Sequence, residues 1–303
     1  KVFVYNQQMQ AKTAGYWKKW QENYAIVPLY RGIFAVPVDV IADSLRGFNE
    51  GLLDVKLRPE KVIAASEAII DDMIDSVLKM MPAGQDFPVI YNPQHVSAFI
   101  SPKDYEKVYW PFYKRMVDAF TEHGNTVWTF FEGAQDQHLE RLQDLPHGKC
   151  VAQFENTDLE SAKRYLGGKI CIAGGMPNSI LAKGSVHDVE EQVSRVMKLF
   201  ADEPGFIMST NGAINSAKPE NIVAWLKATR KYGNLGGRLE ISESLTNHVN
   251  QPPGDRKLKN NITPWEEVRA EFGEIKGDED LIKFYWEKLE RDALSLVNMI
   301  IQA

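Results

Sequence analysis

The chain has 303 residues, of which 44% are hydrophobic and 25% are charged, and its formal net charge is -6. This composition is typical of a globular protein, and the scattered basic residues argue against a nucleic-acid partner. No apolar run reaches the roughly 18 residues of a membrane span, so we expect no membrane association. The two cysteines, Cys150 and Cys171, have neither CxxC nor zinc-ligand spacing, and a cytoplasmic protein without disulfides is the expectation.

From about residue 59 the sequence alternates short β-rich runs with longer helical patterns, as in βα units around a parallel sheet. Residues 59–81 predict a helix with Pro59 in its first turn. Its apolar stripe consists of Val62, Ile69, Met73, Val77 and Met80. The strand "FPVIY" (87–91) follows, and Ser101 then caps a second helix that Pro111 should kink and Gly124 should end.

The same alternation continues to residue 233. The expected strands are "TVWTFF", "KCVAQF", "KICIAGG" and "GFIMS", and the expected helices are 136–145, "TDLESAKRYLG" capped by Thr157, "SVHDVEEQVSRVMKLFA" and "KPENIVAWLKATRKYG". Five such units in a row predict one domain over residues 1–303 with an α/β fold, a (β/α)8 TIM-like barrel. A doubly wound open sheet is the second choice, because its glycine fingerprint is not found.

The two ends of the chain depart from this pattern. The first 58 residues predict an irregular region, and 59–233 hold the clear βα units. Residues 234–303 predict a surface excursion followed by a C-terminal amphipathic helix. The apolar stripe of that helix either packs on the barrel or forms a homodimer contact.

Residues that follow the expected strands are the candidates for function, because barrel enzymes carry their active sites at the C-terminal strand ends. They are Asn92, His95, Glu132, Gln135, Glu155, Met176, Asn178, Ser209 and Asn211. Glu132 either serves catalysis or favours the start of a helix, and His95 either transfers protons or bonds the backbone. Four other histidines are expected to be solvated: His138, His147, His187 and His248.

Residues of about 45–235 resemble the uroporphyrinogen decarboxylase superfamily, which contains the decarboxylase of haem synthesis and corrinoid-linked methyltransferases. The resemblance lies in "ISPKDYEKVYWPFYKRMVDAFTEHG", "TVWTFFEG", "FENTDLESAKRYLGGKICIAGGMPNSIL" and "GFIMSTNGAINSAKPENIVAWLKATRKYG". It implies a (β/α)8 barrel. In the thiol-dependent methyltransferases of this superfamily, three zinc ligands match Phe130, Glu132 and Asn211 here. Phenylalanine cannot ligate a metal, so we expect no metal site.

The decarboxylase branch of the superfamily is also matched incompletely. Asn92 falls near the aspartate that hydrogen-bonds the pyrrole nitrogens, and no recognisable arginine-rich motif is found in the N-terminal region. A pocket with Phe130 and Phe131 as an apolar wall and Glu132 as an acid would suit an aromatic or macrocyclic ligand.

Three functional hypotheses follow from the resemblance. The first is a corrinoid-linked methyltransferase or demethylase without the usual zinc ligands, in which His95, Glu132 and Asn211 are catalytic. It implies a small-molecule substrate and a corrinoid (cobalamin), with no covalently bound cofactor, carried by a corrinoid protein. The second is a decarboxylase of a porphyrinogen-like or aromatic carboxylate. The third is a tetrapyrrole-binding protein without catalysis.

Overall fold

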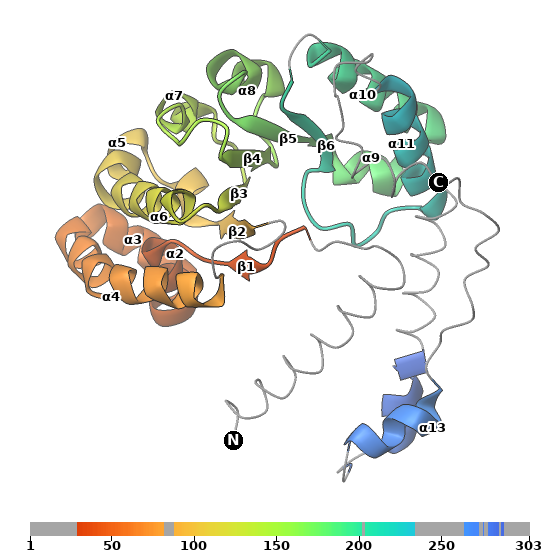
Figure 1. Cartoon of the computed structure of the whole chain (residues 1–303), viewed down its shortest axis with the longest axis horizontal. Helices are drawn as coiled ribbons and strands as arrows, with labels where there is room; N and C mark the ends of the chain where they lie inside the picture. Colours follow the sequence, from red (N-terminus) through yellow and green to blue (C-terminus); the bar gives the residue numbers. More distant parts are fainter. Residues whose placement is uncertain are drawn as a thin grey trace. The chain divides into compact units, whose positions relative to one another are not determined.

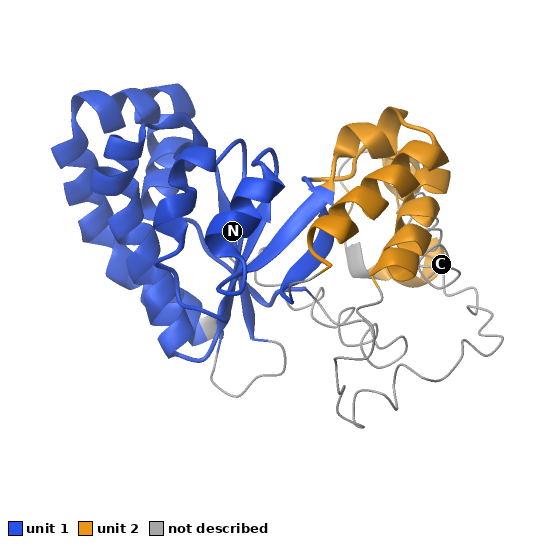
Figure 2. Ribbon diagram, turned by 90° about the horizontal axis from the view of Figure 1, so that it is seen from above, with its two compact units in different colours: residues 1–175, 203–212 blue, residues 176–202, 213–303 orange. Residues whose placement is uncertain are grey.

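The computed structural model describes residues 29–81, 88–201, 204–233, 264–272, 275, 278–284 and 286–287. The chain forms two compact units (Figure 2). The first comprises Lys1–Gly175 and Glu203–Gly212, and the second comprises Met176–Asp202 and Ala213–Ala303.

The first unit is built on a six-stranded sheet whose strand order follows the chain (Figure 1). The strands are β1 (Gly32–Ile33), β2 (Val89–Gln94), β3 (Thr126–Phe131), β4 (Cys150–Phe154), β5 (Cys171–Met176) and β6 (Phe206–Thr210). The pairs from β1 to β5 are parallel, with Ile90 opposite Val127 and Val127 opposite Cys150. Successive parallel strands joined by helices have the strand order of a (β/α)8 barrel, which confirms the predicted fold class.

Helices follow the strands of the first unit. They are α2 (Pro37–Val40), α3 (Phe48–Leu57), α4 (Pro59–Met80), α5 (Pro102–Asp104), α6 (Trp110–Glu122), α7 (Leu139–Leu142) and α8 (Leu159–Leu166). Two π-helical segments, η1 (Ile41–Arg46) and η3 (Tyr105–Tyr109), and two 3-10 turns, η2 (Val96–Phe99) and η4 (Asp136–His138), connect them.

The core of the first unit lies between the sheet and α6. The buried face of α6 consists of Trp110, Phe112, Tyr113, Met116, Val117, Phe120 and Thr121. The Tyr113 hydroxyl is 2.8 Å from Thr129 Oγ1 on β3, and the ring of Phe131 stacks on Phe154 with centroids 5.3 Å apart. Aromatic burial of this kind supplies much of the apolar area that holds a helix onto a sheet.

The two long helices begin where their sequence patterns predict. α4 begins at Pro59, and its most buried apolar side chains are Val62, Ile70, Ile74 and Val77. The predicted stripe is therefore wrong at Ile69 and Met73, which are only partly buried, because Ile70 and Ile74 face the core in their place. Ser101 caps α5 by accepting the amide N–H of Asp104, as predicted. The expected kink at Pro111 takes the form of η3, a π-helical stretch that ends immediately before α6. Proline removes a helical N–H, so irregular hydrogen bonding in the preceding turn is its usual effect.

Two helix predictions need correction. The helix expected over 136–145 is only η4 and α7, which end at Leu142. Asp158, not Thr157, is the N-cap of α8, and its carboxylate accepts the amide N–H of Ser161. Thr157 instead accepts the amide N–H of Gln135 through Oγ1.

The prediction of an irregular N-terminal region is wrong for residues 29–58. They contain β1, α2, η1 and α3, and β1 pairs with β2 through Gly32 and Ile90. A strand of two residues is too short to leave an alternating pattern in the sequence. Residues 1–28 lie outside the described part of the chain.

The second unit contains α9 (Asn178–Lys183), α10 (Val186–Leu199), α11 (Pro219–Tyr232), α13 (Trp265–Val268) and the 3-10 turn η5 (Arg269–Phe272). Asn221 of α11 is buried and donates to the carbonyls of Leu181 and Gly184 at the end of α9. The excursion over 234–263 and most of the C-terminal helix lie outside the described residues. In the parts of the chain that are described, no helix is long and apolar enough to span a bilayer.

Candidate active site

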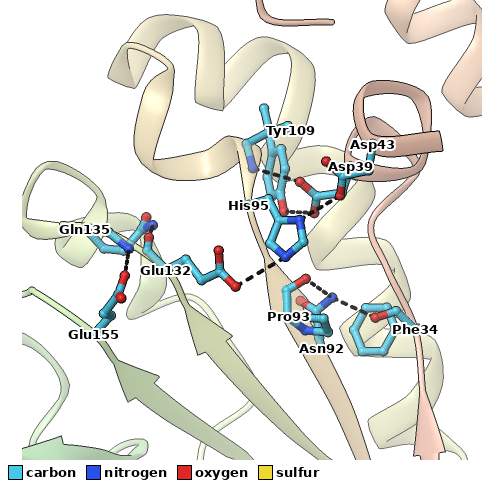
Figure 3. A network of polar contacts seen from close by, with 12 residues as sticks. Phe34, Asp39, Asp43, Asn92, Pro93, His95, Tyr109, Glu132, Gln135 and Glu155 are labelled. Carbon is cyan, nitrogen blue, oxygen red and sulfur yellow. Dashed lines mark hydrogen bonds and ion pairs between the residues drawn. The ribbon is translucent and has the colours of Figure 1, made fainter. Parts of the chain in front are cut away.

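A histidine flanked by two carboxylates lies at the carboxyl ends of β2 and β3 (Figure 3). His95 Nδ1 is 2.7 Å from Asp43 Oδ2, and His95 Nε2 is 3.2 Å from Glu132 Oε1. The side chains are 38% (His95), 32% (Asp43) and 40% (Glu132) exposed, so a ligand in solvent can reach them. The structure thus brings together two of the residues predicted to be catalytic, His95 and Glu132.

The strand register explains why His95 and Glu132 meet. Gln94, the last residue of β2, is opposite Phe131, the last residue of β3. His95 and Glu132 each follow by one residue, and the Glu132 amide donates to the Gln94 carbonyl at 3.4 Å. Parallel strands that end at the same level therefore deliver an imidazole and a carboxylate side by side.

Asp43 reaches His95 from the helical segment after β1. It lies in η1, which continues directly from α2, and Asp39 lies one turn earlier on α2. Asp39 is fully buried, and its Oδ1 accepts the Val96 amide N–H at 2.9 Å. Its Oδ2 accepts the Tyr109 hydroxyl at 2.6 Å (Figure 3).

The electrostatics of this group favour a charged histidine. Burial alone would lower the pKa of His95, but the hydrogen bond with Asp43 and the charges of Glu132, Asp43 and Asp39 outweigh burial and raise it. An imidazolium near neutral pH can donate both ring N–H groups, one to Asp43 and one to Glu132. Burial raises the pKa of Glu132, while the charge of His95 lowers it and those of Glu155 and Asp43 raise it further.

The buried carboxyl of Asp39 should make the free energy of unfolding depend on pH. Burial raises its pKa to about 6, although the hydrogen bonds from Tyr109 and Val96 oppose this. Between pH 3.8 and about 6 the folded state holds a proton that the unfolded chain has released. This stabilisation is therefore present at low pH and is lost as the pH rises through about 6, by about 3 kcal/mol at most.

We expect Asp39→Asn to remove this pH dependence. Urea unfolding at pH 4.5, 5.5 and 7.0 should show that the wild type loses more free energy of unfolding than the variant as the pH rises. The comparison uses the slope of the free energy of unfolding against pH. The asparagine amide places an N–H donor where Asp39 has an acceptor, and this changes stability by the same amount at every pH. Parallel slopes for the two proteins would mean that Asp39 titrates as an ordinary exposed carboxyl.

Several predicted binding residues instead hold the scaffold around this group. Gln135 is buried and donates through Nε2 to Ser97 Oγ and to the Glu132 carbonyl, each at 2.9 Å. The Glu155 carboxylate accepts the amide N–H of Gly133 at 2.7 Å, and Asn92 is buried with its amide donating to the Phe34 carbonyl. They shape the loops that carry His95 and Glu132.

The two phenylalanines before Glu132 have different environments. Phe131 is fully buried against Phe154 and Tyr113, so it belongs to the core, contrary to the expected ligand wall. Phe130 is 8% exposed and lies on the opposite face of β3, because side chains alternate along a strand. Of the two phenylalanines, Phe130 is therefore the one on the face away from α6.

Asn211 and Ser209, at the end of β6, are also engaged. The Asn211 amide donates to the Glu155 carbonyl at 2.5 Å, and its Oδ1 accepts the Gly175 amide N–H at 3.1 Å. Ser209 Oγ accepts from Gln153 Nε2 at 3.3 Å. Met176 is buried, and Asn178 donates to the Ala213 carbonyl; both belong to the second unit.

Sequence reasoning missed three residues of the site: Asp39, Asp43 and Tyr109. The available signal was the carboxylate of Asp39 within the apolar run "FAVPVDVIA", since a charge there is costly unless it is used. His138, expected to be solvated, is buried; its ring stacks on Tyr105 at 4.0 Å and its Nε2 lies 3.1 Å from the Ser97 carbonyl. Burial lowers its pKa, so it differs from His95.

The donor groups of the site suit proton transfer better than metal binding. Both ring nitrogens of His95 face carboxylates, and both amide atoms of Asn211 bond the backbone. Within the described residues, no three His, Cys, Asp or Glu side chains are arranged to hold a metal ion. The arrangement can donate a proton from His95 Nε2, with Glu132 as acceptor and Asp43 orienting the ring.

Comparisons with known proteins agree with this fold. The family model described as uroporphyrinogen decarboxylase (URO-D) matches residues 17–232, more than half of the chain. The uroporphyrinogen decarboxylase of Syntrophotalea carbinolica is 25% identical over 164 residues, which cover 54% of this chain and 46% of that protein. That of Geobacter metallireducens is 27% identical over 134 residues, covering 44% and 38%. The chain thus spans about half the length, or less, of these curated relatives.

A solved methyltransferase from Methanosarcina mazei has a similar structure, with a TM-score of 0.53 and 15% identity. The match covers 70% of this chain and 61% of that one, and at this identity it shows the fold alone. Together with the family match, it places a (β/α)8 barrel beneath the site described above. The chain belongs to the uroporphyrinogen decarboxylase superfamily, as a divergent member.

Proposed function

We propose that this barrel enzyme transfers a methyl group between a heteroatom of a small-molecule substrate and a corrinoid carried by a partner protein. The observation that carries the proposal is the Asp43–His95–Glu132 group, with His95 Nε2 3.2 Å from Glu132 Oε1. A neutral heteroatom that loses a methyl cation to a reduced corrinoid is left as an anion and must gain a proton. His95 supplies that proton from Nε2, and in the reverse direction the pair removes it.

The chemistry of the residues at the superfamily's zinc positions supports a route without that metal site. Phe130 has no donor atom. Asn211 uses its amide nitrogen for the Glu155 carbonyl and its oxygen for the Gly175 amide. Glu132 is then the one ionisable residue of the three, and its oxygen faces His95. Activation of the heteroatom is therefore assigned to a Brønsted acid, His95.

The charges around Glu132 support this proposal over the decarboxylation of a substrate that carries many carboxylates. The charges that act on Glu132 are one cation, His95, and two anions, Glu155 and Asp43. A further anion there would be repelled by Glu155 and Asp43, because like charges raise each other's pKa and oppose ionisation. A neutral heteroatom substrate fits this site better.

Decarboxylation remains the second candidate because the curated relatives are decarboxylases. In that reaction His95 would protonate the carbon that loses carbon dioxide, so His95 would be the proton donor in both candidate reactions. The two reactions differ in their products.

The test is an anaerobic assay of the intact protein with reduced cobalamin and a panel of methyl ethers, methylthioethers and methylamines. We expect one methyl class to convert the absorbance spectrum from that of reduced to that of methylated cobalamin, with the demethylated product found by mass spectrometry. A parallel assay measures carbon dioxide release from uroporphyrinogen. Carbon dioxide release without demethylation of any panel member would overturn the methyl-transfer proposal in favour of the second candidate.

A further inference from the structure

One helical segment holds two consecutive residues of the active-site loop. Asp43 in η1 faces the side chain of His95, and Asp39 in α2 accepts the backbone N–H of Val96. The two aspartates are one helical turn apart, and the two residues they hold are adjacent in the chain. The helix therefore fixes both the ring of His95 and the peptide that follows it.

Burial of the Asp39 carboxylate beside the active-site loop costs folding free energy. Its side chain is 1% exposed, and its oxygens accept one N–H from Val96 and one O–H from Tyr109. Both donors are uncharged, and the charges that act on Asp39 are His95 and Asp43, one of each sign. A buried carboxylate without a basic side chain bonded to it costs stability, and such groups are concentrated at functional sites.

The two π-helical segments supply the outer parts of this arrangement. Asp43 lies within η1, and Tyr109 is the last residue of η3. π-helical turns occur frequently at functional sites. Here one of them supplies Asp43, which contacts His95, and the other supplies Tyr109, which donates to Asp39.

We propose that Asp39 and Tyr109 are positioning residues that hold His95 in line with Glu132. The Tyr109 hydroxyl fixes the Asp39 carboxylate, Asp39 fixes the Val96 peptide, and the ring of His95 is thereby held between Asp43 and Glu132. The inference rests on the proposed proton-transfer role of His95, and it does not depend on which methyl donor or acceptor is used.

The groups that set the protonation of His95 come from three elements. Asp39 and Asp43 face it from α2 and η1, and Glu132 faces it from the end of β3. Tyr109, from η3, bonds Asp39, and Glu155, after β4, acts on Glu132. Loss of the Tyr109 hydroxyl leaves Asp39 with one donor, which makes its charged form less favourable and weakens the support for the His95 cation.

The experiment follows the ring nitrogens of His95 by ¹⁵N NMR during a pH titration of the intact protein without substrate. The signal is assigned by its loss in His95→Gln. Asp39→Asn and Tyr109→Phe are compared with Tyr113→Phe, a matched control. Tyr113 is also buried, lies four residues further along, and loses the same kind of hydrogen bond, to Thr129.

We expect both Asp39→Asn and Tyr109→Phe to lower the pKa of His95 and to shift its ring signals at a pH where it is neutral. Tyr113→Phe should lower the thermal midpoint by a similar amount and leave the His95 titration unchanged. Equal shifts in Tyr109→Phe and Tyr113→Phe, or none in Tyr109→Phe, would overturn the proposal. If Asp39→Asn does not fold, the comparison of Tyr109→Phe with Tyr113→Phe still tests the positioning role.

The titration also separates this inference from the proposed function. It needs no substrate, so a normal His95 titration in Tyr109→Phe rejects the positioning role whatever the enzyme does. Conversely, a shifted titration together with a negative cobalamin assay supports the positioning role and rejects only the methyl-transfer proposal. Where activity is found, Tyr109→Phe should lower kcat by roughly tenfold to a hundredfold, the scale on which misplacement of a reacting group acts.

Discussion

His95→Gln should lower kcat/KM by about 10² to 10⁴-fold, the range that a positioned general acid or base contributes. Glutamine keeps a polar side chain of similar reach, yet it cannot carry the proton. The free energy of unfolding should change little, because His95 is 38% exposed and its partners remain solvated. The measurement is steady-state kinetics on the substrate found in the cobalamin assay, beside urea unfolding of the same samples.

The same kinetic measurements on Glu132→Gln and on the double variant His95→Gln/Glu132→Gln test whether the two residues act together. If His95 and Glu132 act as one proton-transfer pair, the double variant should lose hardly more activity than His95→Gln alone, because residues that act as a unit are not additive. His147→Gln is the matched control, since His147 is exposed and its Nε2 lies 3.3 Å from the Gln143 carbonyl, far along the chain from the carboxylates of the site. Strictly multiplicative losses in the double variant would argue against a pair.

Phe131→Ala should lower the free energy of unfolding by about 3 to 5 kcal/mol, as large-to-small changes in cores do. The ring is fully buried, stacks on Phe154 and meets Tyr113 edge to face at 6.2 Å. The alanine leaves a cavity between the sheet and α6. Urea unfolding followed by tryptophan fluorescence measures the loss.

Phe99→Ala is the control for that change. Phe99 is 63% exposed and meets Phe48 edge to face, so its removal should cost far less stability. The comparison also tests the role of Phe131. A ligand wall would show a small stability loss and weaker ligand binding, whereas a core residue shows the reverse. Equal losses of stability in Phe131→Ala and Phe99→Ala would contradict the core assignment.

The regular parts of the fold could be predicted because local patterns determine them. The proline at the first turn of α4 is a property of the local sequence, and the structure follows it, whereas the buried stripe contains Ile70 and Ile74 where Ile69 and Met73 were predicted. β1 could not be found, because two residues carry no alternation and its place depends on pairing with β2. The π-helical segments could not be predicted either, because η1 contains no proline or glycine that would indicate a change from α to π hydrogen bonding.

The site divides in the same way. His95 and Glu132 could be selected because each follows an apolar run, and a barrel places such residues at one end. Asp43 is 52 residues from His95 and Asp39 is 57 residues from Val96, so nothing local connects them. His138 illustrates the reverse error: most of its neighbours in sequence are polar, but in the 3-10 turn η4 its ring stacks on Tyr105.

A ligand that binds the side-chain amide of Asn211 would break hydrogen bonds that connect the ends of neighbouring strands. The Asn211 side chain joins the Glu155 carbonyl after β4 and the Gly175 amide in β5 to the end of β6. Any molecule that recruits this amide must first free two backbone groups, and each buried group left unpaired costs about 1 to 3 kcal/mol. Occupancy at this position and release of the Gly175 amide are therefore thermodynamically linked, so a ligand there would be detected as faster hydrogen exchange of that amide at the end of β5.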